Sequence, residues 1–261
     1  MAYRYITASS AGAVTTLSLA RPDKLNALVL GVLDELTAAV DAALAGGARA
    51  LVLTGEGRLF CSGADLTDDE MDDDAFADLG LGLETHYNPL LCKLAALDIP
   101  LITALNGPVA GGGVGLALSG DLVVMGQSGY ILLPFANIGL VPDVGATWLI
   151  GRSIGRARLL EMALLGERLT ADDAKAAGLV NRVVPDAEVL ATAQALAARL
   201  AAGPTRAFGA IRRQVAFALD NDFAATLELE RVNQRLCGRT HDAAEAITAF
   251  GEKRKPKFKG Q

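Results

Sequence analysis

Residues 99–120 read IPLITALNGPVAGGGVGLALSG and carry no charged side chain. A run of this length would suit a membrane-spanning helix, but Pro100, the residues Asn106-Gly107-Pro108 and three consecutive glycines at 111–113 interrupt it. Proline and glycine at these places favour a buried strand, a tight loop and a buried helix in succession. We therefore predict that this unit lies in the core of a protein without a membrane partner.

Apolar runs of strand length recur on both sides of this unit and alternate with helical patterns. The clearest helical pattern covers residues 28–45 and ends at Gly46-Gly47, which suits a left-handed C-cap. Strands that alternate with helices predict parallel pairing in an α/β fold. Strands without polar alternation predict a sheet that is covered by helices on both faces. The predicted strands are Val14–Leu19, Ala50–Thr54, Leu101–Leu105, Leu122–Met125 and Val180–Val184.

The composition changes near Ala191, beyond which the chain reads as successive helices. We therefore predict a core over residues 1–197 and a helical C-terminal region over residues 198–261. Residues 250–261, FGEKRKPKFKGQ, hold five of the 24 basic residues. The region is either a solvated subdomain or an oligomerisation layer whose basic end reaches a phosphate. Its helices should break at Gly203-Pro204, Asp220-Asn221-Asp222 and Gly238-Arg239-Thr240.

The composition of the 261-residue chain argues against several classes of protein. Its 24 basic and 30 acidic residues give a net charge of −6, which argues against a nucleic-acid partner. Its three cysteines form no CxxC pair, so neither a disulfide framework nor a zinc knuckle is predicted. The start, MAYRYITASS, has no apolar signal region, and we expect a cytoplasmic protein.

Metal and nucleotide motifs are also missing. His86 and His241 form no HExxH pattern, and the glycines at 111–115 do not fit the G-x-G-x-x-G dinucleotide fingerprint. Residues 65–78 carry eight carboxylates, but Asp73 stands where an EF-hand loop needs glycine. We interpret this stretch as a solvated loop, and we expect no metal and no permanently bound cofactor.

Two glycine-bearing segments look more specific. They are Phe60-Cys61-Ser62-Gly63-Ala64-Asp65, after a predicted strand, and the segment 106–113, which leads into a predicted helix. Glycine lets a ligand approach the backbone closely, and a helix start offers free N–H groups. One N–H from each segment would make an oxyanion hole. The alternative is that these glycines only permit tight packing.

Two lone carboxylates stand out, because the 53 residues between Asp98 and Arg152 carry only the charges of Asp121 and Asp143. Burying an ionised carboxylate without compensation is costly. Asp121 opens a strand and suits a structural hydrogen-bonding role. Asp143 is either the N-cap of the next helix or a desolvated general base with a raised pKa.

Taken together, these segments resemble the crotonase superfamily, the enoyl-CoA hydratase/isomerase family, over essentially the whole chain. The resemblance implies a crotonase (ClpP-like) α/β fold, a spiral of ββα turns followed by a helical trimerisation region. The motifs that carry it are RPDKLNAL at 21–28, FCSGADL at 60–66, NGPVAGGGVGLALSGD at 106–121, PFANIGLVPDVGATWL at 134–149 and FGEKRKPKF at 250–258.

The resemblance also assigns roles at the site. The oxyanion hole of the family falls on the N–H groups of Ala64 and Gly112. The two glutamates of the family's hydratases fall on Gly115 and Phe135, neither of which can move a proton. Asp143 stands where the family's isomerases place their acid. The substrate-binding positions implied by the two loops also include Gly63, Asp65 and Gly111.

The absence of the two hydratase glutamates, at Gly115 and Phe135, favours an isomerase over a hydratase. The segment 134–149 most resembles the ring-epoxide isomerases of phenylacetate catabolism and the Δ3,Δ2-enoyl-CoA isomerases. The expected reaction shifts a double bond, or isomerises a ring epoxide, in a coenzyme A thioester, with Asp143 as base and Phe135 as an apolar wall. The alternatives are an enoyl-CoA hydratase, a thioesterase or other enolate-using relative, and a non-catalytic acyl-CoA-binding homologue.

The coenzyme A thioester is expected as substrate. The resemblance suggests Lys24 near its nucleotide end, with Phe250 and Lys253 reaching the nucleotide of a neighbouring subunit, since a cation attracts phosphate. The family implies a homotrimer or a dimer of trimers. The carboxylates of residues 65–78 would repel coenzyme phosphates, so we expect them to face solvent.

Overall fold

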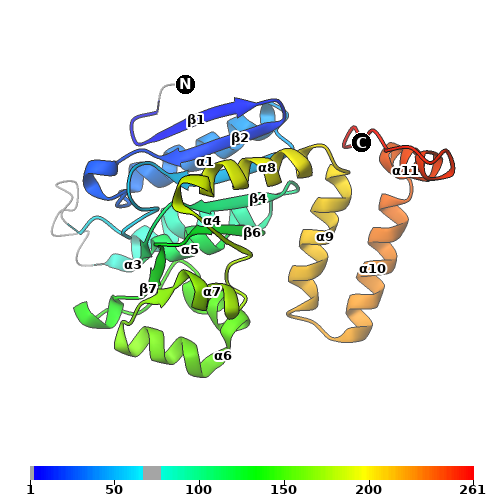
Figure 1. Cartoon of the computed structure of the whole chain (residues 1–261). Helices are drawn as coiled ribbons and strands as arrows, with labels where there is room; N and C mark the ends of the chain where they lie inside the picture. Colours follow the sequence, from blue (N-terminus) through cyan, green and yellow to red (C-terminus); the bar gives the residue numbers. More distant parts are fainter. Residues whose placement is uncertain (1–2, 67–77) are drawn as a thin grey trace.

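The computed structural model describes residues 3–66 and 78–261 and is built around a six-stranded sheet with the order β1-β2-β3-β4-β6-β9 (Figure 1). Strands β2, β3, β4, β6 and β9 pair in parallel, as the alternation of strands and helices predicts. Only β1 runs antiparallel to its neighbour β2. The strands are β1 (Ile6–Ala11), β2 (Val14–Leu19), β3 (Ala50–Gly55), β4 (Leu101–Leu105), β6 (Leu122–Gly126) and β9 (Arg182–Val184).

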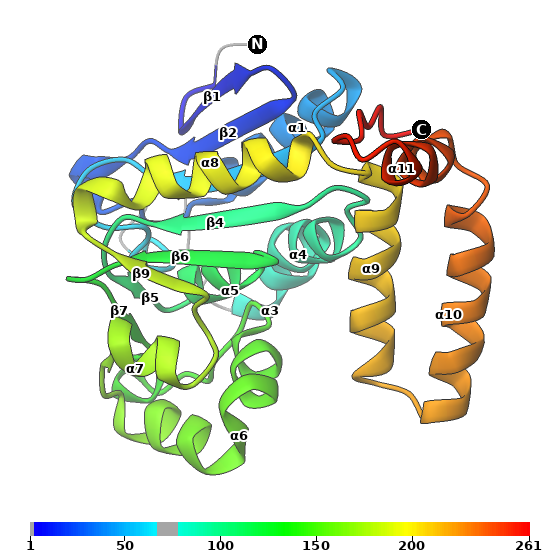
Figure 2. The ribbon, with the colours of Figure 1, turned by 45° about the vertical axis from the view of Figure 1, so that its right-hand side comes forward.

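Helices cover both faces of this sheet, which explains why its strands lack polar alternation. Leu51 and Leu53 of β3 belong to the apolar core that also contains buried residues of α1, α4 and α5. Ala50 and Val52, which point the other way, belong to the core formed with α8. Figure 2 shows α8 lying along the sheet. The covering helices are α1 (Leu30–Ala45), α4 (Asn88–Ala95), α5 (Gly113–Leu118) and α8 (Val189–Ala201).

A second, three-stranded sheet with the order β5-β7-β8 lies next to the first. Between β7 and β8 the chain forms the short η3 turn and the long helix α6, and α7 follows β8. Short helical turns η1, α3 and η2 complete the region around the two glycine-bearing segments. The bounds are η1 (Pro22–Lys24), α3 (Leu79–Gly82), η2 (Leu83–Tyr87), β5 (Val109–Ala110), β7 (Tyr130–Leu132), η3 (Phe135–Ile138), α6 (Ala146–Leu165), β8 (Leu169–Thr170), α7 (Ala171–Ala176) and η4 (Asp186–Glu188).

The C-terminal region consists of α9 (Thr205–Ala218), α10 (Phe223–Cys237) and α11 (His241–Gly251), which project away from the core (Figures 1 and 2). All three predicted helix breaks are confirmed. The predicted division at 197/198 falls inside α8, whose Ala197 and Ala201 pack on the sheet. The core therefore extends to the end of α8, and the projecting part begins with α9.

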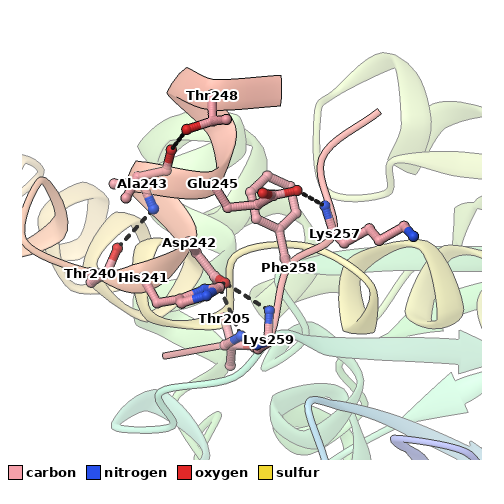
Figure 3. A network of polar contacts seen from close by, with 12 residues as sticks. Thr205, Thr240, His241, Asp242, Ala243, Glu245, Thr248, Lys257, Phe258 and Lys259 are labelled. Carbon is pink, nitrogen blue, oxygen red and sulfur yellow. Dashed lines mark hydrogen bonds and ion pairs between the residues drawn. The ribbon is translucent and has the colours of Figure 1, made fainter. Parts of the chain in front are cut away.

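The residues after α11 fold back on it rather than trailing into solvent. The buried carboxylate of Asp242 accepts hydrogen bonds from the backbone N–H groups of Lys259 and Gly260, each at 2.7 Å. Glu245 accepts a third such bond, from the N–H of Lys257 at 2.8 Å (Figure 3). The tail thus has a fixed backbone, while the Phe250 side chain is 87% exposed.

Asp121, the first of the two lone carboxylates, has the structural role that its position suggests. Its carboxylate accepts the N–H of Leu101 at 2.8 Å and pairs with the Arg212 guanidinium at 2.7 Å. It thereby joins the start of β4 to α9. None of the described helices is both long and apolar enough to cross a membrane.

Candidate functional site

The two glycine-bearing segments meet at one edge of the main sheet. They follow β3 and β4, which are parallel neighbours, so both leave the sheet at the ends of their strands. Cys61 forms a parallel bridge with Val109, and the N–H of Ala110 donates to the Cys61 carbonyl at 2.9 Å. The N–H of Phe60 donates to the Pro108 carbonyl at 3.1 Å. These bonds hold the two loops side by side.

Gly63 shows how closely the loops approach each other. Its φ is +99°, and a Cβ at this position would stand 3.1 Å from the Ala110 carbonyl oxygen and 3.4 Å from the Gly112 nitrogen. Its backbone conformation therefore favours glycine strongly, and a Cβ would in addition force the neighbouring loop to move by a few tenths of an ångström. The tight-packing interpretation of the glycines is correct for Gly63, and that packing brings the Gly112 nitrogen beside the first loop.

Two backbone N–H groups at this junction donate to no other residue in the described part of the chain. Leu28 donates to the Gly63 carbonyl and accepts from the N–H of Asp65, so the Ala64 N–H between them points away from Leu28. Gly112 is the N-cap of α5, where N–H groups have no intrahelical partner. Among the residues that the structure describes, neither the Ala64 nor the Gly112 N–H donates a hydrogen bond. Gly111, by contrast, donates to the Leu132 carbonyl.

The Asp143 carboxylate lies beside Gly112 at this junction. Its Oδ1 is 3.5 Å from the position that a Cβ on Gly112 would occupy. This oxygen is buried and has no hydrogen-bond partner among the described residues. Burial raises the pKa of Asp143 from 3.8 to about 6. The N-cap alternative is wrong, because the N-cap of α6 is Gly145 and no side chain caps this helix.

Val144 contributes a contact that sequence patterns did not indicate. Its φ is +49°, a strained conformation for a β-branched residue. This conformation turns its carbonyl oxygen toward α5, where the oxygen lies 1.9 Å from the position of a Cβ on Gly115. The space that a side chain at Gly115 would need is therefore filled by the turn that carries Asp143.

Tyr87 is a second residue that the sequence did not mark. It ends the π-helical turn η2, a geometry often found at functional sites, and its Cε1 lies 3.9 Å from the same Cβ position on Gly112. Burial raises the pKa of the Tyr87 phenol, with smaller contributions from Cys61 and Asp143. Burial likewise raises the pKa of the Cys61 thiol to about 12, so this thiol is not a reactive thiolate.

Other predicted positions lie in different surroundings. Asp65 does not face solvent as expected, because it is 8% exposed and pairs with Arg21 at 3.1 Å. Asp78 is exposed and caps α3, whereas the carboxylates between positions 68 and 74 lie outside the described residues. Phe135 starts η3 and is buried in the main core.

The predicted coenzyme-binding residues are not gathered in one place. Lys24 is exposed at the end of η1, which directly precedes the segment that pairs with Ala64. Phe250 and Lys253 lie at the end of α11, on the side of the molecule opposite to α3 in Figure 1. Within one chain they are thus remote from the two loops. In the described ranges no cluster of three His, Cys, Asp or Glu side chains could hold a metal.

The sequence also contains a G-x-S-x-G pattern, GRSIG at 151–155. In a nucleophile elbow, such a serine stands on a strand-to-helix turn. Here the pattern lies inside α6, and the Ser153 hydroxyl donates to the Leu149 carbonyl at 3.3 Å. The pattern therefore does not form a catalytic serine site.

The known proteins that resemble this chain match it over nearly its whole length and bear related descriptions. The family model described as enoyl-CoA hydratase/isomerase matches residues 9–261. The 1,2-epoxyphenylacetyl-CoA isomerase of Escherichia coli (strain K12) is 43% identical over 254 residues, which cover 95% of each chain. A probable enoyl-CoA hydratase of Rhodobacter capsulatus is 40% identical over 265 residues and 100% of both chains. A crystal structure of enoyl-CoA hydratase subunit I from Geobacillus kaustophilus HTA426 has a TM-score of 0.91 at 36% identity and covers 99% of both chains.

Proposed function

This chain belongs to the enoyl-CoA hydratase/isomerase family, and from that premise we propose that it is an isomerase that moves a double bond, or isomerises a ring epoxide, in an acyl-CoA thioester. One observation carries the proposal. The Oδ1 of Asp143 is buried and has no hydrogen-bond partner among the described residues. It lies beside Gly112, whose N–H is one of the two that donate to no described residue. A base and an oxyanion hole are thus neighbours.

The reaction begins with the thioester carbonyl oxygen between the N–H groups of Ala64 and Gly112. Asp143 removes a proton from C2, and the electron pair of the broken C–H bond moves onto the thioester oxygen as an enolate. The two N–H groups stabilise this charge, and one such donor is typically worth about 10²–10³ in rate. Asp143 then returns the proton at C4, which leaves the double bond between C2 and C3.

The pKa of about 6 suits this role. At neutral pH the Asp143 carboxylate is mostly ionised and can accept a proton, yet it is a stronger base than an ordinary aspartate. A single carboxylate is enough, because the proton leaves and returns through the same group.

Addition of water requires further groups that these positions lack. The resemblance to the family places the hydratase glutamates at Gly115 and Phe135. At Gly115 the Val144 carbonyl fills the space of a side chain, and Phe135 is apolar and buried. A hydratase is nevertheless the second candidate, because the Rhodobacter capsulatus relative bears that description.

We propose the coenzyme A thioester as substrate and a homotrimer or dimer of trimers as the assembly. In such an assembly Phe250 and Lys253 of one subunit would approach the nucleotide bound near Lys24 of another. Supporting this, the C-terminal helices expose large apolar side chains that a neighbouring subunit could cover. These are Ile211, Val215, Leu219, Phe223, Leu227, Leu236, Ile247 and Phe250.

Product analysis distinguishes the candidates. The protein is incubated with a 3-enoyl-CoA and, separately, with a 2-enoyl-CoA, and the products are resolved by chromatography. An isomerase converts the first to the 2-enoyl-CoA without releasing free CoA. A 3-hydroxyacyl-CoA as the main product would indicate a hydratase, free CoA a thioesterase, and binding without turnover a non-catalytic homologue.

A further inference from the structure

Tyr87 has a hydroxyl for which the proposed mechanism has no use. The side chain is 8% exposed, and within the described ranges its hydroxyl makes no hydrogen bond. In the described part of the chain the hydroxyl is not one of the fully buried polar atoms that lack a partner, so it still contacts solvent, and a group that displaces this solvent must replace its hydrogen bond. Here the ring lies beside Gly112 and Asp143, where substrate would bind, so a bound ligand is the natural partner of this hydroxyl.

The surroundings of Tyr87 define what the hydroxyl can do. It lies with the Asp143 carboxylate beside Gly112, and an ordinary phenol is already neutral at working pH. It therefore acts as a hydrogen-bond donor and not as a second base.

The thioester oxygen already has two donors, the N–H groups of Ala64 and Gly112. Tyr87 shares the Cβ side of Gly112 with Asp143, the residue assigned to the acyl carbons C2 and C4. A hydroxyl buried against a hydrocarbon chain loses water without gaining a partner, which is unfavourable. The placement of Tyr87 thus suits an acyl group that carries an acceptor of its own.

We propose that the Tyr87 hydroxyl donates a hydrogen bond to an oxygen atom on the acyl group, which makes this residue a specificity determinant for acyl-CoA substrates with an epoxide or hydroxyl oxygen near C2–C4. The inference rests on the proposed function and adds the class of acyl group. A site that hydrogen-bonds a substrate oxygen discriminates against the analogue that lacks it.

The test compares two substrates with three proteins. Wild type, Tyr87→Phe and the control Tyr130→Phe are each assayed with an arylacetyl-CoA ring epoxide and with an unsubstituted 3-enoyl-CoA. Tyr130 lies on β7 and stacks against Arg168 at 4.3 Å, so its variant removes a tyrosine hydroxyl from another environment. We expect Tyr87→Phe to lower kcat/KM for the epoxide about tenfold to hundredfold and to change that for the 3-enoyl-CoA less than about threefold.

Equal losses on both substrates, or no loss on the epoxide, would overturn the inference. Wild type that isomerises the 3-enoyl-CoA but ignores the epoxide would also overturn it, while leaving the proposed function intact. The proposed function itself fails only if wild type isomerises neither substrate. The two failures are therefore distinguishable in one set of assays.

Discussion

Replacing Gly115 by alanine should disable the site through the turn that carries Asp143. A Cβ on Gly115 would stand 1.9 Å from the Val144 carbonyl oxygen and 2.7 Å from its Cγ1, whereas real Cβ contacts essentially never fall below 3.0 Å. Either α5 or the Val144 turn must therefore shift by about 1 Å. Because Val144 directly follows Asp143, the shift moves the carboxylate away from Gly112.

The expected size of the effect follows from this displacement. Overpacking of a core by one methyl group typically costs about 1–3 kcal/mol, which for a chain of this length lowers the Tm by about 2–12 °C. A displacement of about 1 Å at a catalytic group can lower the rate about 10²-fold. We therefore expect a folded protein with slightly lower stability and a much lower kcat.

Thermal unfolding and the rate of 3-enoyl-CoA isomerisation measure these two effects. Gly251→Ala is the matched control, because a Cβ at Gly251 would meet nothing within 4 Å. If Gly115→Ala keeps the kcat and the Tm of wild type, the Val144 turn does not position Asp143, and the reasoning is refuted. Gain of hydratase activity in Gly115→Glu would likewise contradict it.

Four further predictions concern three single side chains. The kcat/KM of wild type should rise with pH through about 6 as Asp143 ionises, and a profile flat between pH 5 and 8 would contradict this. Burial raises the folded-state pKa of Asp143, so the folded protein favours the protonated side chain, and this contribution to stability is lost as pH rises through about 6. Asp143→Asn cannot ionise. It should therefore raise the Tm at pH 8 and hardly change it at pH 4. Arg21→Gln removes a cation that pairs with the buried Asp65 and should lower the free energy of unfolding in urea by about 1.5–3 kcal/mol, the value of a charge-assisted hydrogen bond. The rate should fall as well, because this pair holds the loop of Ala64. Asp242→Ala removes the acceptor of two backbone N–H groups in the C-terminal tail. We expect proteases to remove the C-terminal residues faster from this variant, which mass spectrometry detects. An unchanged rate of cleavage would show that other contacts hold the tail.

Four of the strands that the sequence predicted, β2, β3, β4 and β6, are largely buried on both faces, so their apolar runs are nearly continuous. The fifth, β9, was predicted although none of its three residues is fully buried. β1 was missed because five of its six residues are exposed, so ITASSA lacks an apolar run. Its place beside β2 follows from the two-residue turn Gly12-Ala13, in which Gly12 has a positive φ, so the glycine here was the local signal that was overlooked.

The site was only partly predictable, because the sequence marks some of its residues locally and others join it only through tertiary contacts. Asp143 stood out because it is one of two charges in a long apolar stretch, and glycines marked the two loops. Tyr87 and Val144 reach the site through tertiary contacts, which periodicity does not reveal. The ion pair that buries Asp65 joins residues 44 positions apart, so the acidic composition around it wrongly indicated a solvated side chain.

Proton exchange tests the central claim, that Asp143 moves the C2 proton of an acyl-CoA held by the two loops. A 3-enoyl-CoA is followed by NMR in deuterated water with wild type, Asp143→Asn and the exposed control Asp172→Asn. We predict that wild type and the control shift the double bond and exchange the C2 proton. Asp143→Asn should bind the CoA ester but lose about 10²–10⁴-fold in rate. Full activity in Asp143→Asn, or no exchange with wild type, would contradict the account.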